Sequence, residues 1–340
     1  MKKTLLTSAA FLAASTALFA QSLSITAPGY GGAKLFDSTA GFTITGLAAA
    51  PGGDVFYIET DSAPPLAAAH SMLYRRSAGD SYAAATPLFD FGAKVFGSFV
   101  RWDSGRVFFG ESSTGAVRLL KPDLSIDPLG MLAFNYDAAF SGGNLFIAHN
   151  PAGPFGSGSQ VSRFDLPPDG AGGLMLSTTP ATIVDTPDDS SGPIAFDAAG
   201  NLFYGGSGAF GRPDLYRFTA AEVSSAFGGG LPQSLDPAHR FLANGSNAYL
   251  AIAPAGLWHT DFATLDLIDP VTAQDTAIGG NPNPYGIGQL DFADGLLYAA
   301  VTDSSFTHSS VFTVVPEPSS ALLLTLGLAA LTRGRGRRKD

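Results

Sequence analysis

The 340-residue sequence has no cysteine, so disulfide bonds cannot stabilise it in any compartment. Charged residues are also scarce, at 14% of the chain against about 25% in typical soluble proteins. Lysine and glutamate, which favour exposed helices, are correspondingly few. These shortages disfavour a helix-rich fold and require a large apolar core as the source of stability.

Turn-forming residues are abundant by contrast. The chain contains 41 glycines and 23 prolines, which interrupt helices and favour tight turns. It also contains 26 phenylalanines, which favour β-strands. The composition therefore predicts an all-β fold built from short strands and many turns.

The charge is unevenly distributed along the chain. The formal net charge is −10, but the two ends hold seven of the 19 basic residues and only two of the 29 acidic ones. The 12 basic and 27 acidic residues that remain give the middle of the chain a charge of about −15. A field of this sign repels nucleic acid and anionic lipid, so neither is an expected partner of the middle.

The N-terminus has the pattern of a secretory signal peptide. Lys2 and Lys3 form a charged start, residues 5–19 are mostly apolar, and Ala20 offers a small residue before the cut. Cleavage after Ala17 is the alternative. Residues 1–20 are therefore expected to be removed during export.

The C-terminus combines three features in a fixed order. A short polar motif comes first, formed by Val315, Pro316, Glu317, Pro318, Ser319 and Ser320. An apolar run over residues 321–331 follows, and a basic tail closes the chain with Arg333, Arg335, Arg337, Arg338 and Lys339. An apolar run closed by basic residues stops transfer, with the positive end in the cytoplasm. The run is shorter than the roughly 20 residues of a full span, so it would require snorkelling side chains or local thinning of the bilayer.

This order resembles the PEP-CTERM sorting signal that exosortases recognise in Gram-negative bacteria that make extracellular polysaccharide. The resemblance implies an exosortase-type partner, a single apolar helix as a transient membrane anchor, and processing near residues 316–318. The protein is then released or attached at the cell surface. The expected organisation is a signal peptide (1–20), one domain (21–315) and the sorting signal (316–340).

A repeated phrase divides the middle of the chain. A glycine-containing turn is followed by an apolar strand with an aromatic residue, as at residues 53–57, 105–109, 143–147 and 200–204, and more weakly at 255–259 and 294–298. The mean spacing of about 48 residues fits the four-stranded blade of a β-propeller. The phrase also resembles those of bacterial six-bladed propellers related to NHL and gluconolactonase-like proteins.

The sixth unit lacks room for a fourth strand before the sorting signal. Residues 22–41 precede the first unit and contain two strand-like pieces, 23–26 and 33–36. One of them is expected to complete the last blade, which gives six four-stranded blades closed by an N-terminal strand. A seventh blade within residues 220–247 is the alternative, although residues 220–227 also fit a short helix.

Equivalent positions in different blades form a ring around a propeller axis. The end of the second strand carries Glu59, Glu111, His149 and Asp261 in four of the units. These side chains are candidate ligands for one metal ion, calcium if carboxylates dominate or a transition metal if His149 joins. Asp137, Asp189 and Arg101 lie near the same end of their hairpins. The alternative is that polar residues simply occupy strand ends.

The sequence carries no catalytic motif such as a nucleophile elbow, a paired-histidine zinc helix or a phosphate loop. The leading hypothesis is therefore a surface or matrix protein that binds polysaccharide or a protein partner and needs no cofactor beyond a possible calcium ion. A secreted metal-dependent hydrolase or lactonase-like enzyme is the alternative, and a passive spacer is the third interpretation.

Overall fold

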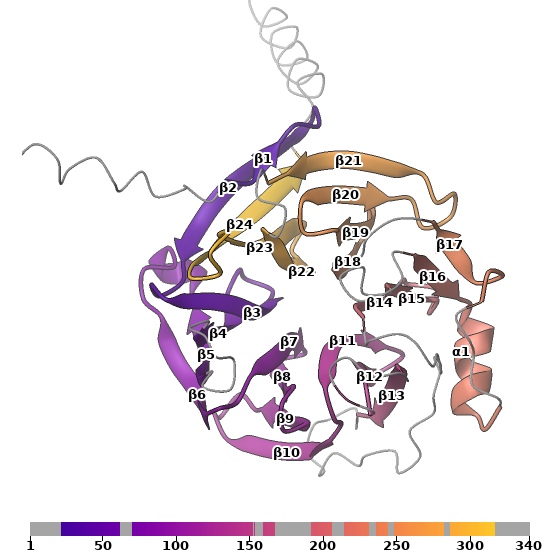
Figure 1. Cartoon of the computed structure of the whole chain (residues 1–340), viewed down its shortest axis with the longest axis horizontal. Coiled ribbons are helices and arrows are strands. Elements are labelled where there is room, and N and C mark those ends of the chain that lie inside the picture. The colour runs from indigo at the N-terminus through magenta and orange to yellow at the C-terminus, as the bar shows by residue number, and fades with distance from the viewer. Residues whose placement is uncertain are drawn as a thin grey trace, which may run out of the picture.

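Six antiparallel sheets surround a common axis in the computed structural model, which describes residues 22–61, 70–151, 153, 159–166, 192–205, 214–230, 236–243, 248–281 and 286–316. The innermost strand of each sheet faces the axis (Figure 1). The predicted all-β, six-bladed propeller is therefore confirmed. The predicted signal peptide and C-terminal helix lie outside the described residues.

The first three blades follow one another along the chain. Blade 1 contains β3 (Phe42–Ala49), β4 (Val55–Asp61), β5 (His70–Arg76) and β6 (Thr86–Ala93). Blade 2 contains β7 (Gly97–Asp103), β8 (Arg106–Glu111), β9 (Ala116–Leu120) and β10 (Ile126–Met131). Blade 3 has three strands in the described part of the chain, β11 (Asn135–Ser141), β12 (Asn144–His149) and β13 (Gln160–Asp165). Residues 167–191, which follow this blade in the sequence, fall outside that part.

The other three blades complete the ring. Blade 4 contains β14 (Ile194–Phe196), β15 (Leu202–Gly205), β16 (Leu215–Phe218) and β17 (Arg240–Leu242). Blade 5 contains β18 (Tyr249–Ala253), β19 (Gly256–Thr260), β20 (Thr264–Ile268), β21 (Asp275–Gly280) and the added β1 (Ser24–Ile25). Blade 6 contains β22 (Ile287–Ala293), β23 (Leu296–Thr302), β24 (Ser309–Pro316) and β2 (Tyr30–Asp37).

Two-residue turns join the two innermost strands in several blades. Ser104 and Gly105 have φ values of 50° and 83°, and Asp294 and Gly295 have values of 50° and 81°. Two successive positive φ angles define the turn type whose twist suits a β-hairpin, and glycine adopts them at little cost. The repeated glycine of the sequence therefore fixes the turn of the hairpin that the two innermost strands form.

The N-terminal segment closes the ring. Strand β2 pairs antiparallel with β24, from Tyr30 opposite Pro316 to Asp37 opposite Ser310. Strand β1 adds to the outer edge of blade 5 through β21. The predicted closure is confirmed, and both strand-like pieces of the segment are used, in two adjacent blades.

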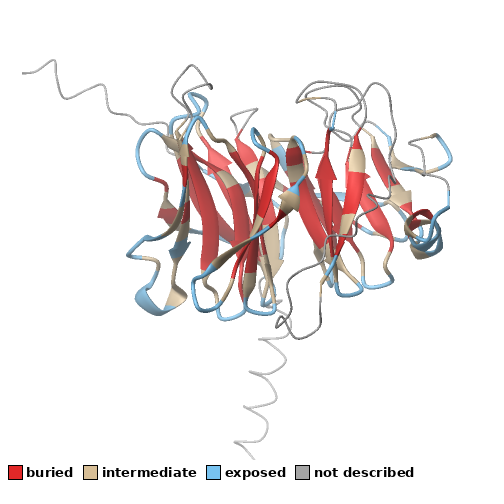
Figure 2. Ribbon diagram, turned by 90° about the horizontal axis from the view of Figure 1, so that it is seen from below, coloured by how far each residue is buried: buried red, intermediate tan, exposed pale blue. Residues whose placement is uncertain are grey.

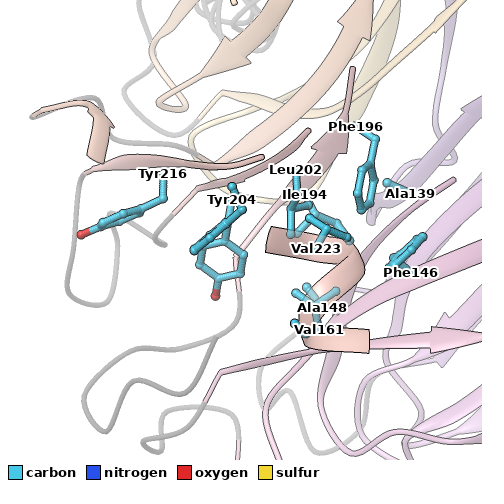
Figure 3. Packing of buried hydrophobic residues seen from close by; sticks show 12 residues of the cluster. Ala139, Phe146, Ala148, Val161, Ile194, Phe196, Leu202, Tyr204, Tyr216 and Val223 are labelled. Atoms are coloured by element: carbon cyan, nitrogen blue, oxygen red, sulfur yellow. The ribbon is translucent and has the colours of Figure 1, made fainter. Parts of the chain in front are cut away.

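A short helix lies in the segment that offered the alternative of a seventh blade. Helix α1 (Ala220–Phe227) begins at Thr219, whose side chain and that of Glu222 form a reciprocal capping box. Its buried residues Val223 and Ala226 belong to the apolar cluster between blades 3 and 4, which also contains Phe146; Val223 and Phe146 are labelled in Figure 3. Strand β17 then completes blade 4, so the described part of residues 220–247 supplies a helix and an outer strand.

The core lies between adjacent blades rather than in one central cluster. The inner strands of the blades are buried over most of their length, while the outer strands and the connecting turns are more exposed (Figure 2). Separate apolar clusters fill the successive blade interfaces, with fully buried aromatic residues such as Tyr57, Phe99 and Phe203. Each blade is therefore stabilised by both of its neighbours, which explains why an open ring is unfavourable.

Candidate functional site

The predicted ring residues of blades 1 and 2 lie at strand ends, as expected, but they contact local partners. Glu59 is 2% exposed, and its carboxylate accepts a hydrogen bond from the backbone nitrogen of Thr39 at 2.9 Å. Glu111 is 3% exposed. It accepts hydrogen bonds from Arg118 Nε at 2.7 Å and from Thr114 Oγ1 at 2.5 Å. Glu59 thus fixes the linker into blade 1, and Glu111 fixes a turn within blade 2.

The ring residues of blades 3 and 5 behave in the same way. His149 is buried, and its Nε2 lies 2.8 Å from Ser162 Oγ on the adjacent strand. Burial lowers the pKa of His149 to about 4, because it disfavours the imidazolium. Asp261 follows β19, and its carboxylate accepts hydrogen bonds from the backbone nitrogens of Ala263 and Thr264 at 2.9 and 2.6 Å.

No cluster of metal-ligand atoms within the described residues unites the four predicted ring side chains. A group with three such atoms within 4.8 Å of one another is a different one, formed by His259, Asp266 and Asp275 of blade 5. A metal ion shared by Glu59, Glu111, His149 and Asp261 stays a prediction.

Arg101 and Asp137, which the sequence places near the predicted ring residues, meet on the propeller axis. The Arg101 guanidinium donates to Asp137 Oδ1, and it also donates to the carbonyl oxygens of Ala138 at 2.7 Å and Leu47 at 3.0 Å. Asp137 Oδ2 accepts from the backbone nitrogen of Ile194 at 3.0 Å. This ion pair therefore ties the inner strands of blades 1 to 4 together. The third nearby residue, Asp189, lies outside the described residues.

Burial governs the electrostatics of this ion pair. Desolvation raises the pKa of Asp137, while the positive charge of Arg101 and the backbone donors of Ile194 and Ala138 oppose the rise. Asp291 of blade 6 lies half-buried near Arg101, and desolvation raises its pKa as well. Its Oδ2 accepts from the backbone nitrogen of Ala49 at 2.7 Å, which joins blade 6 to blade 1.

A cavity of about 540 Å³ opens at one end of the axis. Its walls are the first residues of the inner strands and the loops that leave the second strands. We call it the aromatic pocket, after its lining residues Phe96, Tyr136, Tyr249, Phe262 and Phe306. A volume of this size is typical of pockets that enclose a small ligand or part of a larger one.

The aromatic residues of the pocket are held in a defined arrangement. The rings of Tyr136 and Tyr249 are stacked, with centroids 5.9 Å apart, and Phe262 meets Tyr249 edge-on at 6.4 Å. The Tyr136 hydroxyl donates to the carbonyl oxygen of Ala248 at 3.0 Å. Burial raises the pKa of Tyr136 and of Tyr249, so both phenols stay protonated at neutral pH.

Two of the pocket's aromatic residues have unusual backbone conformations. Phe262 has a φ of 77° and Phe306 a φ of 56°, in the left-handed region that aromatic residues rarely adopt. Phe306 is also 47% exposed. Left-handed aromatic residues are not confined to the pocket, because Tyr82 and Phe134 adopt the same region outside its lining. Backbone strain of this kind clusters at functional sites, and at Phe262 and Phe306 it positions two of the lining rings.

The remaining lining of the pocket is rich in neutral polar groups. It includes the hydroxyl groups of Thr43, Thr45, Thr60, Ser98, Ser112, Thr302, Ser305 and Thr307, and the amide of Asn135. Asp61 contributes a carboxylate, and the described lining contains no lysine or arginine. Sequence patterns did not identify this site. Phe262 and Phe306 were a possible signal of it, because both lie in loops, where a large apolar residue is rarely needed.

A smaller cavity of about 200 Å³ lies toward the other end of the inner strands, where Arg101, Trp102 and Asp291 contribute to its lining. The aromatic pocket is lined by earlier residues of the same strands, such as Ser98 of β7 and Tyr136 of β11. The Arg101–Asp137 pair therefore lies between the two cavities, and Arg101 contributes to the lining of the smaller one.

The sorting motif starts within the folded domain. Val315 and Pro316 end strand β24, opposite Gly31 and Tyr30 of β2. Glu317, Pro318, Ser319, Ser320 and the basic tail lie outside the described residues. Among the residues that are described, no helix is both long and apolar enough to span a membrane.

The family model of the PEP-CTERM protein-sorting motif matches residues 314–339. The chain carries a PEP-CTERM sorting motif. This match confirms the resemblance seen in the sequence, and such a motif implies export and transient anchoring before exosortase processing. A search of curated proteins finds no significant match to the chain.

Solved structures share the fold at low sequence identity. A chain of the mitotic checkpoint complex is 11% identical with a TM-score of 0.53, over 85% of this chain and 94% of that one. The PQQ-bound aldose sugar dehydrogenase of Streptomyces coelicolor is 15% identical with a TM-score of 0.52, over 85% and 100%. A catalytically inactive virginiamycin B lyase of Staphylococcus aureus is 12% identical with a TM-score of 0.50, over 84% and 99%. These similarities support the propeller fold alone.

Proposed function

We propose that this protein is exported, processed near residues 316–318 by an exosortase-type enzyme, and then acts at the cell surface or outside the cell. There its propeller binds a neutral polysaccharide segment in the aromatic pocket. The pocket is the observation that carries the binding role, and the sorting motif is the observation that carries the location.

The position of the sorting motif supports processing without damage to the domain. Strand β24 ends at Pro316, so the tail begins where the sheet ends. Pro316 and Pro318 favour an extended backbone, which suits the active-site groove of a peptidase. Removal of the tail would leave the pairing of β24 with β2 in place, and the released domain would keep its closed ring.

The chemistry of the pocket supports binding of a sugar. Aromatic rings offer flat apolar surfaces to the C–H faces of a pyranose, and hydroxyl and amide groups exchange hydrogen bonds with its hydroxyls. The described lining supplies both kinds of group, with Tyr136 and Phe306 among the rings and Thr43 and Ser112 among the polar side chains.

The electrostatics favour a neutral glycan over an acidic one. The middle of the chain carries about −15, and the described lining offers a carboxylate in Asp61 but no basic side chain. A uronic-acid or sulfated polymer would therefore be repelled. The alternative of a metal-dependent hydrolase or lactonase-like enzyme requires the ring residues to share an ion, whereas Glu59 and Glu111 are engaged by local partners.

The test is affinity electrophoresis of the exported protein through gels that contain neutral or uronic-acid polysaccharides. Gly288 lines the pocket, and an added Cβ there would meet its nearest atoms at 3.5 Å or more. Gly288→Leu is therefore expected to fill the pocket and abolish retardation by neutral polymers, with the melting temperature nearly unchanged. Gly79→Leu, the same change at an exposed turn far from the lining, should bind as the wild type does.

The mobilities of the wild type and the two variants distinguish the possible outcomes. Retardation of the wild type by neutral polymers, lost in Gly288→Leu alone, supports it. Equal mobility of both variants, or retardation by acidic polymers only, contradicts it.

A further inference from the structure

Blade 5 contains a group of three ionisable side chains that is separate from the predicted ring. His259 of β19, Asp266 of β20 and Asp275 of β21 each offer a ligand-type atom, and these three atoms lie within 4.8 Å of one another. His259 and Asp266 are directly opposite each other in the sheet. His259 is 3% and Asp266 7% exposed, while the side chain of Asp275 is 38% exposed. The group therefore reaches from the buried interior to the outer strand.

The distances in this group are too long for hydrogen bonds. His259 Nε2 lies 3.5 Å from Asp275 Oδ1 and 3.8 Å from Asp266 Oδ2, whereas a hydrogen bond of this kind spans about 2.7–3.2 Å. Neither ring nitrogen of His259 has a hydrogen-bond partner among the described residues. A buried polar group without a partner is unfavourable by about 1–3 kcal/mol, so something else is expected to satisfy the imidazole.

The same distances fit side chains that share a metal ion. Nitrogen and oxygen ligands lie about 2.0–2.2 Å from zinc, so two ligands at a tetrahedral angle are about 3.4 Å apart. The 3.5 Å separation matches this value, and the 3.8 Å separation requires only a wider angle. The carboxylate of Asp266 is further oriented by Thr264 Oγ1, which donates to its Oδ2 at 2.5 Å, as outer hydrogen bonds commonly orient metal ligands.

The position of His259 in its strand is one that other blades fill with a core residue. The corresponding residue of the second strand in blades 1 to 4 is Tyr57, Phe109, Ile147 or Tyr204, and each of these is fully buried. Each belongs to the apolar cluster shared with the preceding blade. Blade 5 therefore replaces an apolar core residue with a histidine and places an aspartate opposite it, which is unfavourable for packing without a compensating ligand.

The geometry points to a site for one divalent transition-metal ion, best zinc, held by His259, Asp266 and Asp275. One imidazole and two carboxylates are a mixed nitrogen and oxygen set, which suits zinc or a similar ion better than calcium, because calcium takes six to eight oxygen ligands. The ion would cross-link β19, β20 and β21. Three protein ligands leave a fourth coordination position on the ion, and this position faces the solvent side, where Asp275 lies.

The experiment measures zinc binding to the untagged full-length chain after treatment with a chelator and dialysis. We expect one equivalent of zinc and a rise in melting temperature that calcium does not reproduce. Asp275→Asn changes a partly exposed side chain on the outer strand, so it should fold normally. Its zinc affinity should fall by more than about 100-fold, because loss of even an outer-shell partner lowers affinity by about 10- to 100-fold. His259→Gln should lose the ion altogether.

His239 provides the matched control. It also lies between two carboxylates, but its Nε2 makes a hydrogen bond with Glu222 at 3.2 Å, while its Nδ1 lies 3.1 Å from Asp236 without one. His239→Gln should therefore keep the zinc and the shift in melting temperature. Absence of zinc from the wild type, or unchanged zinc binding by Asp275→Asn and His259→Gln, would overturn the assignment and leave the group as a buried ion pair.

Discussion

Substitution of Phe306 by glycine separates ligand binding from stability. Glycine adopts the φ of 56° freely, and release of a left-handed backbone stabilises the fold by about 1–2 kcal/mol. The ring is 47% exposed, so its removal costs about half of the roughly 2 kcal/mol that burial of a phenylalanine contributes. Glycine also adds about 0.5–1 kcal/mol of chain entropy to the unfolded state. The net change in the free energy of unfolding is therefore expected within about 1 kcal/mol of zero.

Binding should respond differently, because an aromatic contact contributes about 0.5–1.5 kcal/mol. Loss of the ring is expected to weaken binding of a neutral oligosaccharide about 2- to 10-fold, measured by calorimetric titration. Leu124→Gly is the matched control, since Leu124 has a φ of 66° and is 62% exposed, away from the pocket lining. If Phe306→Gly lowers stability by more than about 2 kcal/mol and leaves the affinity unchanged, the ring has a structural role and the reasoning fails.

Three further predictions follow from the axis, the buried histidine and the tail. Arg101→Met should lower the free energy of unfolding in urea by about 3–5 kcal/mol, because it leaves Asp137 buried without its counter-charge; a loss below about 1 kcal/mol would contradict the role of the ion pair in joining the inner strands. His149, with a pKa of about 4 against about 6.5 when unfolded, binds its proton more weakly in the folded state. Stability should therefore fall by roughly 3 kcal/mol as the pH drops from about 6.5 to about 4, and thermal melts of His149→Gln should lack that component. Glu317→Ala and Pro318→Ala should leave the melting temperature unchanged while the precursor accumulates in the membrane of an exosortase-containing host; maturation at the wild-type rate would exclude the motif as the recognition element.

The fold was predictable because it depends on local patterns that repeat. Two-residue turns such as Ser104–Gly105 recur with apolar strands on either side, and their spacing reports the blade. Closure by the N-terminal segment followed from counting strands in the sixth unit. Residues 220–227 fitted a short helix as well as part of a seventh blade, and the capping box of Thr219 and Glu222 explains why the helix begins there.

The site was less predictable because it depends on where side chains point. Glu59, Glu111, His149 and Asp261 lie near the predicted strand ends, where each makes short-range hydrogen bonds that the sequence pattern does not reveal. The aromatic pocket depends on left-handed conformations at Phe262 and Phe306, which no sequence pattern encodes. His259 was noticed only as part of a weak repeat, although a histidine at an apolar register was the informative feature.

The two proposed cleavage sites flank the strands that close the ring. Removal of residues 1–20 leaves a few residues before β1 and β2, and removal of the tail leaves β24 at the end of the chain. The last pair of that ladder joins Tyr30 to Pro316, which has no backbone N–H and cannot donate to its neighbour. The end of the strand is therefore weakly held, and the peptide beyond Val315 can leave the sheet for a protease groove while the pairs from Gly31 to Asp37 keep blade 6 closed. Because β2 and β24 are far apart in sequence, the ring closes only after the whole domain has emerged from the membrane. An anchor that holds the C-terminus until then would allow folding to finish before release.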